Sequence, residues 1–163
     1  MELLDKISAF LVRLLSWIGG FFLVGMIFLT CANILCRFVW VPIKGTFELM
    51  GFFGAIVTAF ALGYTQMKRG HIAVNILVDT FPEKTRKIVA VINHAGCCLF
   101  FGIAAWQISI KATTLMNTGE VTETLRIIYY PFTYGVAFGC VALSLILFTD
   151  LVKSIIPDKE DSR

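Results

Sequence analysis

Residues 47–78, FELMGFFGAIVTAFALGYTQMKRGHIAVNILV, decide the fold that we predict for this chain. The first two thirds of the stretch are apolar, and a basic run that begins at Lys68 follows. Small residues recur at every fourth position, which places them along one face of a helix: Gly51, Ala55, Ala59 and Gly63. In lipid, helices associate through close packing rather than through the hydrophobic effect, and small residues permit that packing. The stretch therefore predicts a membrane-spanning helix that contacts another helix.

The composition of the whole chain is that of an integral membrane protein. Of its 163 residues, 58% are hydrophobic and 15% are charged, whereas roughly 45–50% of the residues of ordinary soluble domains are apolar. About 20 apolar residues cross a bilayer, so the chain has room for four spans and short connections. We predict a single all-α membrane domain over residues 1–163, with spans at 14–36, 47–67, 88–110 and 127–152.

Two segments outside these spans are predicted to be amphipathic helices that lie in the membrane interface. In residues 1–13 and again in residues 72–82, apolar side chains recur at helical spacing opposite polar ones. Residues 153–163 form a polar C-terminal tail. An even number of spans puts both termini on one side of the membrane.

The distribution of basic residues predicts the orientation. Of the 14 Lys and Arg residues, ten fall on the side of the termini, and four fall on the other side: Arg37, Lys44, Lys111 and Arg126. Because Lys and Arg concentrate in cytoplasmic loops, we predict a multi-pass membrane protein with both termini in the cytoplasm. A net charge of only +3, with basic residues scattered at segment ends, argues against a nucleic-acid partner.

We predict no catalytic residue, no cofactor and no metal site. None of the predicted spans has an acid, Lys or Arg near its middle, where a charge that drives transport or proton relay would lie. The five cysteines form no C-x-x-C pair and no Cys/His group at metal-ligand spacing. A membrane haem needs paired axial ligands at matching depth, but His71 lies at a basic boundary while His94 lies within a span. We expect an interhelical hydrogen bond for His94.

Glu48 is the candidate charged residue closest to a span interior. It lies one or two residues inside the second span on the outer side, within plausible reach of Arg37 or Lys44. One interpretation is a boundary ion pair that fixes the loop between the first two helices. The other is that Glu48 or Arg37 contacts another subunit. Asn33 is expected to hydrogen-bond between or along helices, with Arg37 one turn away as a candidate partner.

The order of these features resembles the small membrane subunit of tripartite ATP-independent periplasmic (TRAP) transporters, the DctQ-like family. That family shows an Arg near the outer end of the first span, a Pro, a Glu-Leu pair, a Gly-rich helix and a basic-Gly-His-Ile/Val signature before an amphipathic helix that ends in Pro. The matching residues are Arg37, Pro42, Glu48-Leu49, Gly51, Gly54, Gly63, Lys68-Arg69-Gly70-His71-Ile72 and Pro82-Glu83-Lys84. The chain departs from the family at Asn75, where an Asp is frequent, and at Phe47, where many members have Trp.

The resemblance implies a non-catalytic scaffold within a larger complex of the bacterial inner membrane. A large DctM-like membrane subunit would carry the substrate and sodium sites and move like an elevator, and a periplasmic binding protein would deliver an organic anion, a carboxylate or a sulfonate. The residues expected to contact the large subunit are Arg37, Glu48, Gly51, Ala55, Ala59, Gly63, Arg69 and His71. Those expected to help dock the binding protein are Lys44, Lys111, Glu120, Glu123 and Arg126.

Two other classes of protein compete with this interpretation. A membrane-anchor or cytochrome-like subunit of a redox complex is supported by His94 and by the size of four spans. A small exporter built from dimers of four-span chains would need an ionisable carboxylate within the membrane, which the predicted spans lack.

Overall fold

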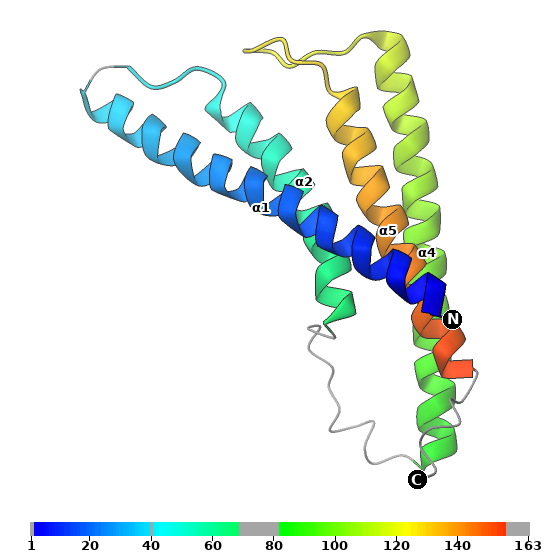
Figure 1. The fold of residues 1–163 in the computed structure, drawn as a ribbon. Coiled ribbons are helices and arrows are strands. Elements are labelled where there is room, and N and C mark those ends of the chain that lie inside the picture. Colours follow the sequence, from blue (N-terminus) through cyan, green and yellow to red (C-terminus); the bar gives the residue numbers. More distant parts are fainter. Residues whose placement is uncertain (1, 40, 69–81, 156–163) are drawn as a thin grey trace.

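The computed structural model describes residues 2–39, 41–68 and 82–155, and four long helices make up most of them (Figure 1). They are α1 (Glu2–Val39), α2 (Thr46–Met67), α4 (Glu83–Thr118) and α5 (Tyr130–Ile155). Each contains a segment long and apolar enough to cross a membrane: Ser8–Val39, Thr46–Met67, Ile88–Thr118 and Tyr130–Val152. The prediction of an all-α membrane protein with four spans is confirmed.

Two of the helices extend well past the predicted span boundaries. α1 is continuous from Glu2, so residues 2–13 are its first turns rather than a separate interfacial helix. At 38 residues it is about 57 Å long, nearly twice the ~30 Å hydrocarbon core, so it tilts or projects beyond that core. α4 begins directly after Pro82 and ends at Gly119, whose positive φ of 66° stops it. The predictions for residues 72–81 and 156–163 lie outside the described residues.

The helices pack in the order α1, α2, α5, α4 (Figure 1). α4 and α5 form an antiparallel pair, and α1 and α2 lean away from this pair toward the end that carries the α1–α2 and α4–α5 connections, which we call the loop end. The core lies where α1, α2 and α5 cross, and it consists of Leu15, Ile56, Ala59, Phe60 and Ala142. α5 is the most covered span, whereas α1 and α4 form the flanks.

Small residues make the central contact between α2 and α5. Gly139 lies so close to α2 that a Cβ added to it would come within 2.8 Å of the Ala59 carbonyl oxygen. One turn earlier, a Cβ on Gly135 would meet Ile56 at an ordinary 3.8 Å. The G-x-x-x-G pair of the last span therefore packs the chain's own helices.

The stripe of small residues on α2 divides into two halves. Ala59 is 5% exposed and Gly63 is buried, and a Cβ on Gly63 would lie 3.3 Å from Ile146 of α5. Gly51 and Ala55 are exposed, and no atom of the described residues lies within 4 Å of a Cβ added to Gly51. Half of the stripe thus serves internal packing, and only the half toward the loop end is open to a partner.

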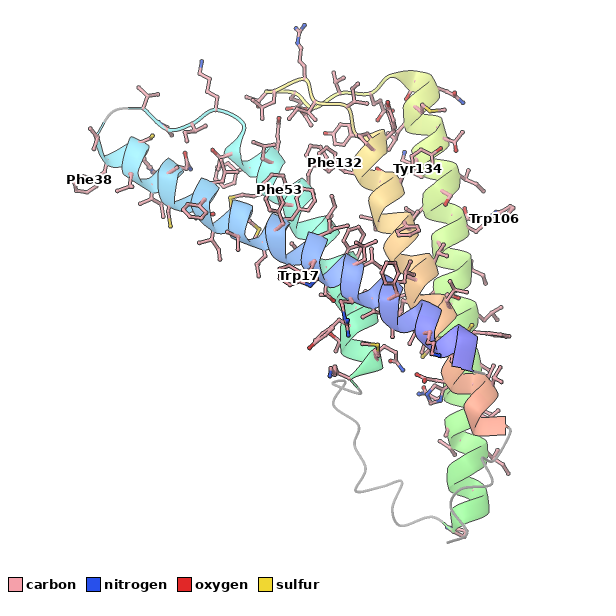
Figure 2. The ribbon with its side chains drawn as sticks, in the orientation of Figure 1. Trp17, Phe38, Phe53, Trp106, Phe132 and Tyr134 are labelled. Carbon is pink, nitrogen blue, oxygen red and sulfur yellow. The ribbon has the colours of Figure 1, made fainter. Side chains whose placement is uncertain are left out.

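Large apolar side chains cover the outer faces of the flanking helices. Trp17 on α1 is 78% exposed and Trp106 on α4 is 68% exposed, and both lie on the outside of the bundle (Figure 2). Apolar side chains of this size on the outside are those of a protein surrounded by lipid or by another membrane subunit.

Replacing Gly139 with Ala is expected to separate α2 from α5, because the new Cβ would collide with the Ala59 backbone. Overpacking of this kind costs about 1–3 kcal/mol. The measurement is the temperature at which half of the detergent-purified protein leaves the monodisperse peak in size-exclusion chromatography. The matched control is Gly135→Ala, where the added Cβ has room. Equal midpoints for the two variants would contradict the packing described above.

Candidate partner-contact surface at the loop end

Glu48, in the first turn of α2, joins this helix to the α4–α5 connection. Its two carboxylate oxygens accept the backbone N–H groups of Thr124, at 2.8 Å, and Leu125, at 3.1 Å. We call the bonds from Glu48 to Thr124 and Leu125 the Glu48 clasp. Hydrogen bonds to a charged group are stronger than those between neutral groups, so the clasp links α2 to the α4–α5 connection.

The α4–α5 connection is folded so that it presents these N–H groups to Glu48. The backbone N–H of Thr122 donates to the carbonyl of Ile127 at 2.9 Å, and the N–H of Ile127 donates back to the Thr122 hydroxyl at 3.1 Å. Thr122 is fully buried, and Arg126 takes a positive φ of 54° to complete the turn. Because Thr122 closes the turn internally, the N–H groups of Thr124 and Leu125 remain to bind the carboxylate.

The α1–α2 connection is fixed to its surroundings as well. The Asn33 side-chain oxygen accepts the backbone N–H of Ile43 at 2.9 Å, and the Thr46 hydroxyl donates to the Ile43 carbonyl at 2.8 Å. Gly45 has a positive φ of 75°, and a Cβ at this position would collide with the side chain of Leu125. Leu125 therefore packs directly on the backbone that precedes α2, and the two connections touch.

The expected ion pair of Glu48 with Arg37 or Lys44 is not formed within the described part of the chain. Arg37 lies in the last turn of α1, and Figure 2 shows the neighbouring Phe38 at the far tip of that helix, away from α4 and α5. The Glu48 clasp is favoured over an ion pair with Arg37 or Lys44, because backbone N–H groups that are already fixed in a turn lose less entropy on binding than a long exposed side chain does. Asn33 likewise binds Ile43 rather than Arg37.

Most of the residues expected to dock a partner protein gather at the loop end. Lys44 lies in the α1–α2 connection, while Glu120, Glu123 and Arg126 lie in the α4–α5 connection, and all four are exposed. Lys111 is also exposed, but it lies on α4, two turns before the end of that helix. Arg69 and His71, which were expected to contact another subunit, lie outside the described residues.

His94 does not make the expected interhelical bond. Its Nδ1 atom is 2.7 Å from the carbonyl oxygen of Ala90, one turn earlier on α4. Within the described residues, no group of three or more His, Cys, Asp and Glu side chains is arranged to hold a metal ion.

A polar contact that was not predicted from the sequence lies at the opposite end of α2. Gln66 donates from Nε2 to the Asp150 carboxylate of α5 at 3.0 Å. Both residues lie near the ends of their spans, but the pairing of α2 with α5 cannot be read from either residue alone. Ser144 similarly links α5 to α4 by donating to the Cys98 carbonyl at 3.3 Å.

A family model described as "Tripartite ATP-independent periplasmic transporters, DctQ component" matches residues 26–156. The matched range holds the last third of α1, all of α2, α4 and α5, and both connections at the loop end. No curated protein and no solved structure gives a significant match to the chain.

Replacing Glu48 with Gln is expected to free the α4–α5 connection, because an amide offers one oxygen and no charge to two N–H groups. Losing one charged hydrogen bond should speed hydrogen–deuterium exchange at Thr124 and Leu125 by on the order of tenfold or more. Exchange of the peptide covering residues 119–129 is measured by mass spectrometry on the purified full chain. Glu123→Gln removes a charge from the same connection without touching the clasp and should exchange like the wild type. Equal exchange in Glu48→Gln and the wild type would show that the clasp does not order the connection.

Proposed function

The chain belongs to the DctQ component family of TRAP transporters, and we propose its function on that basis. The family implies the small permease subunit of such a transporter, and it is a family of transporter subunits rather than of catalysts. We infer that this chain scaffolds the large elevator-type subunit and helps dock the periplasmic binding protein. The transport would be sodium-driven uptake of an organic anion, a carboxylate or a sulfonate, across the inner membrane, with both termini of this chain in the cytoplasm.

One observation supports the scaffold role most directly. The other described helices cover only a small part of α1 and α4. Their exposed faces are apolar, so lipid or a second membrane protein suits them. The described helices also run unbroken through their spans, whereas transporter ion sites are typically built where a helix is interrupted. These features favour a rigid subunit that holds a moving partner in place and does not itself bind the transported ions.

The exposed half of the α2 stripe is the best candidate for contact with the large subunit. Gly51 and Ala55 leave the α2 backbone open to close approach at the loop end. Ala59 and Gly63, which the sequence placed in the same interface, are occupied by internal packing with α5. The large-subunit interface that we propose therefore consists of Gly51 and Ala55.

The docking surface that we propose for the binding protein consists of four exposed charged residues at the loop end, Lys44, Glu120, Glu123 and Arg126. Charges at the rim of an interface act mainly on encounter rate and register, and they do so best when their backbone is already ordered. The Glu48 clasp and the Leu125 contact on Gly45 hold Glu120, Glu123 and Arg126 on an ordered connection. Lys111 lies farther along α4 and would contribute at the edge of this surface.

Charge reversal at Arg126 together with Lys44 is expected to weaken docking of the binding protein. Exposed charge pairs contribute about 0.2–1 kcal/mol each, so the Kd should rise roughly two- to tenfold. The measurement is surface plasmon resonance of the purified binding protein over the two-subunit membrane complex in nanodiscs. Lys159→Glu, in the tail predicted to lie on the other side of the membrane, is the control. An unchanged Kd in the double variant would remove this surface from the proposal.

Replacing Gly51 and Ala55 with Leu is expected to lower co-purification of the large subunit from detergent extracts by roughly tenfold, since overpacking an interface costs about 1–3 kcal/mol. The control is Gly96→Leu, at an exposed position of α4 with open space around its Cα among the described residues. Full recovery of the large subunit with the double variant would assign its contact to another face. Transport by reconstituted vesicles that contain this chain alone would overturn the scaffold role itself.

A further inference from the structure

An apolar groove runs along the crossing of α1 and α2, on the outside of the bundle. Between the two helices it has a volume of about 200 Å³, and its walls are Ser16, Gly19, Gly20, Leu23, Val57, Ala61 and Tyr64. It continues along α1 as a wider hollow of about 470 Å³ past Trp17, Phe21 and Val24. Gly20 leaves room for the groove, because a Cβ at this position would meet no described atom within 4 Å beyond its chain neighbours and the nearby backbone of α1.

The lining of the groove is mostly apolar. The Ser16 hydroxyl already donates to the carbonyl of Val12 at 2.7 Å, which leaves Tyr64 as the other wall residue between the two helices with a polar side-chain group. Both helices are membrane spans, so the groove opens toward hydrocarbon. Its chemistry suits a flexible apolar chain.

A basic residue lies one turn beyond the groove on each of its two helices. Arg13 precedes Ser16 and Trp17 by three and four residues on α1, and Lys68 follows Tyr64 by four residues on α2, so each shares a helix face with the groove. Both side chains are exposed, and neither forms an ion pair within the described residues. The antiparallel register, in which Gly63 lies opposite Val12, puts both cations at the same end of the groove.

We propose that this groove binds one acyl chain of an anionic phospholipid, whose headgroup phosphate lies between Arg13 and Lys68. Long basic side chains reach from an apolar surface to the headgroup layer, and each attracts anionic lipid. Trp17, at the rim of the groove, is the residue type that occupies this depth of a membrane. The binding site depends only on the membrane position of α1 and α2 and is independent of the transporter partners.

The rim of the groove favours a lipid over a helix of another subunit. The rings of Trp17 and Phe21 project from α1 and are 78% and 77% exposed. A helix packs at an axis distance of 8–10 Å from its neighbour, and projecting rings would hold it away from the floor at Gly20. A single acyl chain is thin enough to lie between the rings and reach that floor.

Brominated lipids that quench tryptophan fluorescence test this site. The full chain is reconstituted in phosphatidylcholine vesicles with Trp17 as its sole tryptophan, through Trp40→Phe and Trp106→Phe, and brominated phosphatidylglycerol is compared with brominated phosphatidylcholine. Two cations should give phosphatidylglycerol a roughly thirtyfold advantage in occupancy at Trp17, since each contributes about 1 kcal/mol. A chain whose sole tryptophan is Trp106 is the control, because its neighbours one turn away on α4 are uncharged. Equal quenching of Trp17 by the two lipids overturns the proposal.

Two variants separate the headgroup site from the groove. Arg13→Gln with Lys68→Gln should abolish the advantage of phosphatidylglycerol while Trp17 stays in contact with lipid. A Cβ added at Gly20 has open space around it, so Gly20→Leu should place its side chain in the groove and reduce quenching by both lipids. A phosphatidylglycerol advantage that persists in the double variant contradicts the headgroup site. If Gly20→Leu leaves the advantage intact but lowers recovery of the large subunit, the groove belongs to that subunit and the proposal is wrong.

Discussion

The contact between the backbones of α2 and α5 at Ala59 and Gly139 determines how the helices are arranged. Because only glycine permits this approach, α5 is drawn into the centre, with α2 on one side and α4 on the other. α1 then packs against α2 through Leu15 and completes the core. The result is a row of helices whose flanks, α1 and α4, keep most of their apolar surface for lipid or for other subunits.

Polar contacts fix α2 at both of its ends, where the helices no longer pack tightly. At the loop end Glu48 binds the α4–α5 connection, and at the opposite end Gln66 binds Asp150 of α5. These bonds lie where water and headgroups would otherwise compete for the same groups. A close apolar contact in the middle with polar bonds at the ends gives a body that resists bending, which suits the proposed role as a scaffold.

The number and position of the spans could be predicted because a run of about 20 apolar residues is a local property of the sequence. The ends of α1 and α4 could not, since a helix continues through the headgroup region until its backbone is capped, as at Gly119. The spacing of Gly51, Ala55, Ala59 and Gly63 showed that they share a face, but what covers that face depends on how α2 crosses α5. The partner of Glu48 was hidden for a different reason, because its donors are backbone N–H groups that any sequence would contain.

The Glu48 clasp also constrains how the chain is made. Its bonds join residues 76 and 77 positions apart, so they cannot form until α4 has been synthesised and has crossed the membrane. During that interval Glu48 has only water to satisfy its charge, which keeps the start of α2 at the membrane surface. Closure of the clasp therefore requires that α4 has crossed the membrane and that the turn closed by Thr122 and Ile127 has formed, whereas α5 follows later in the chain.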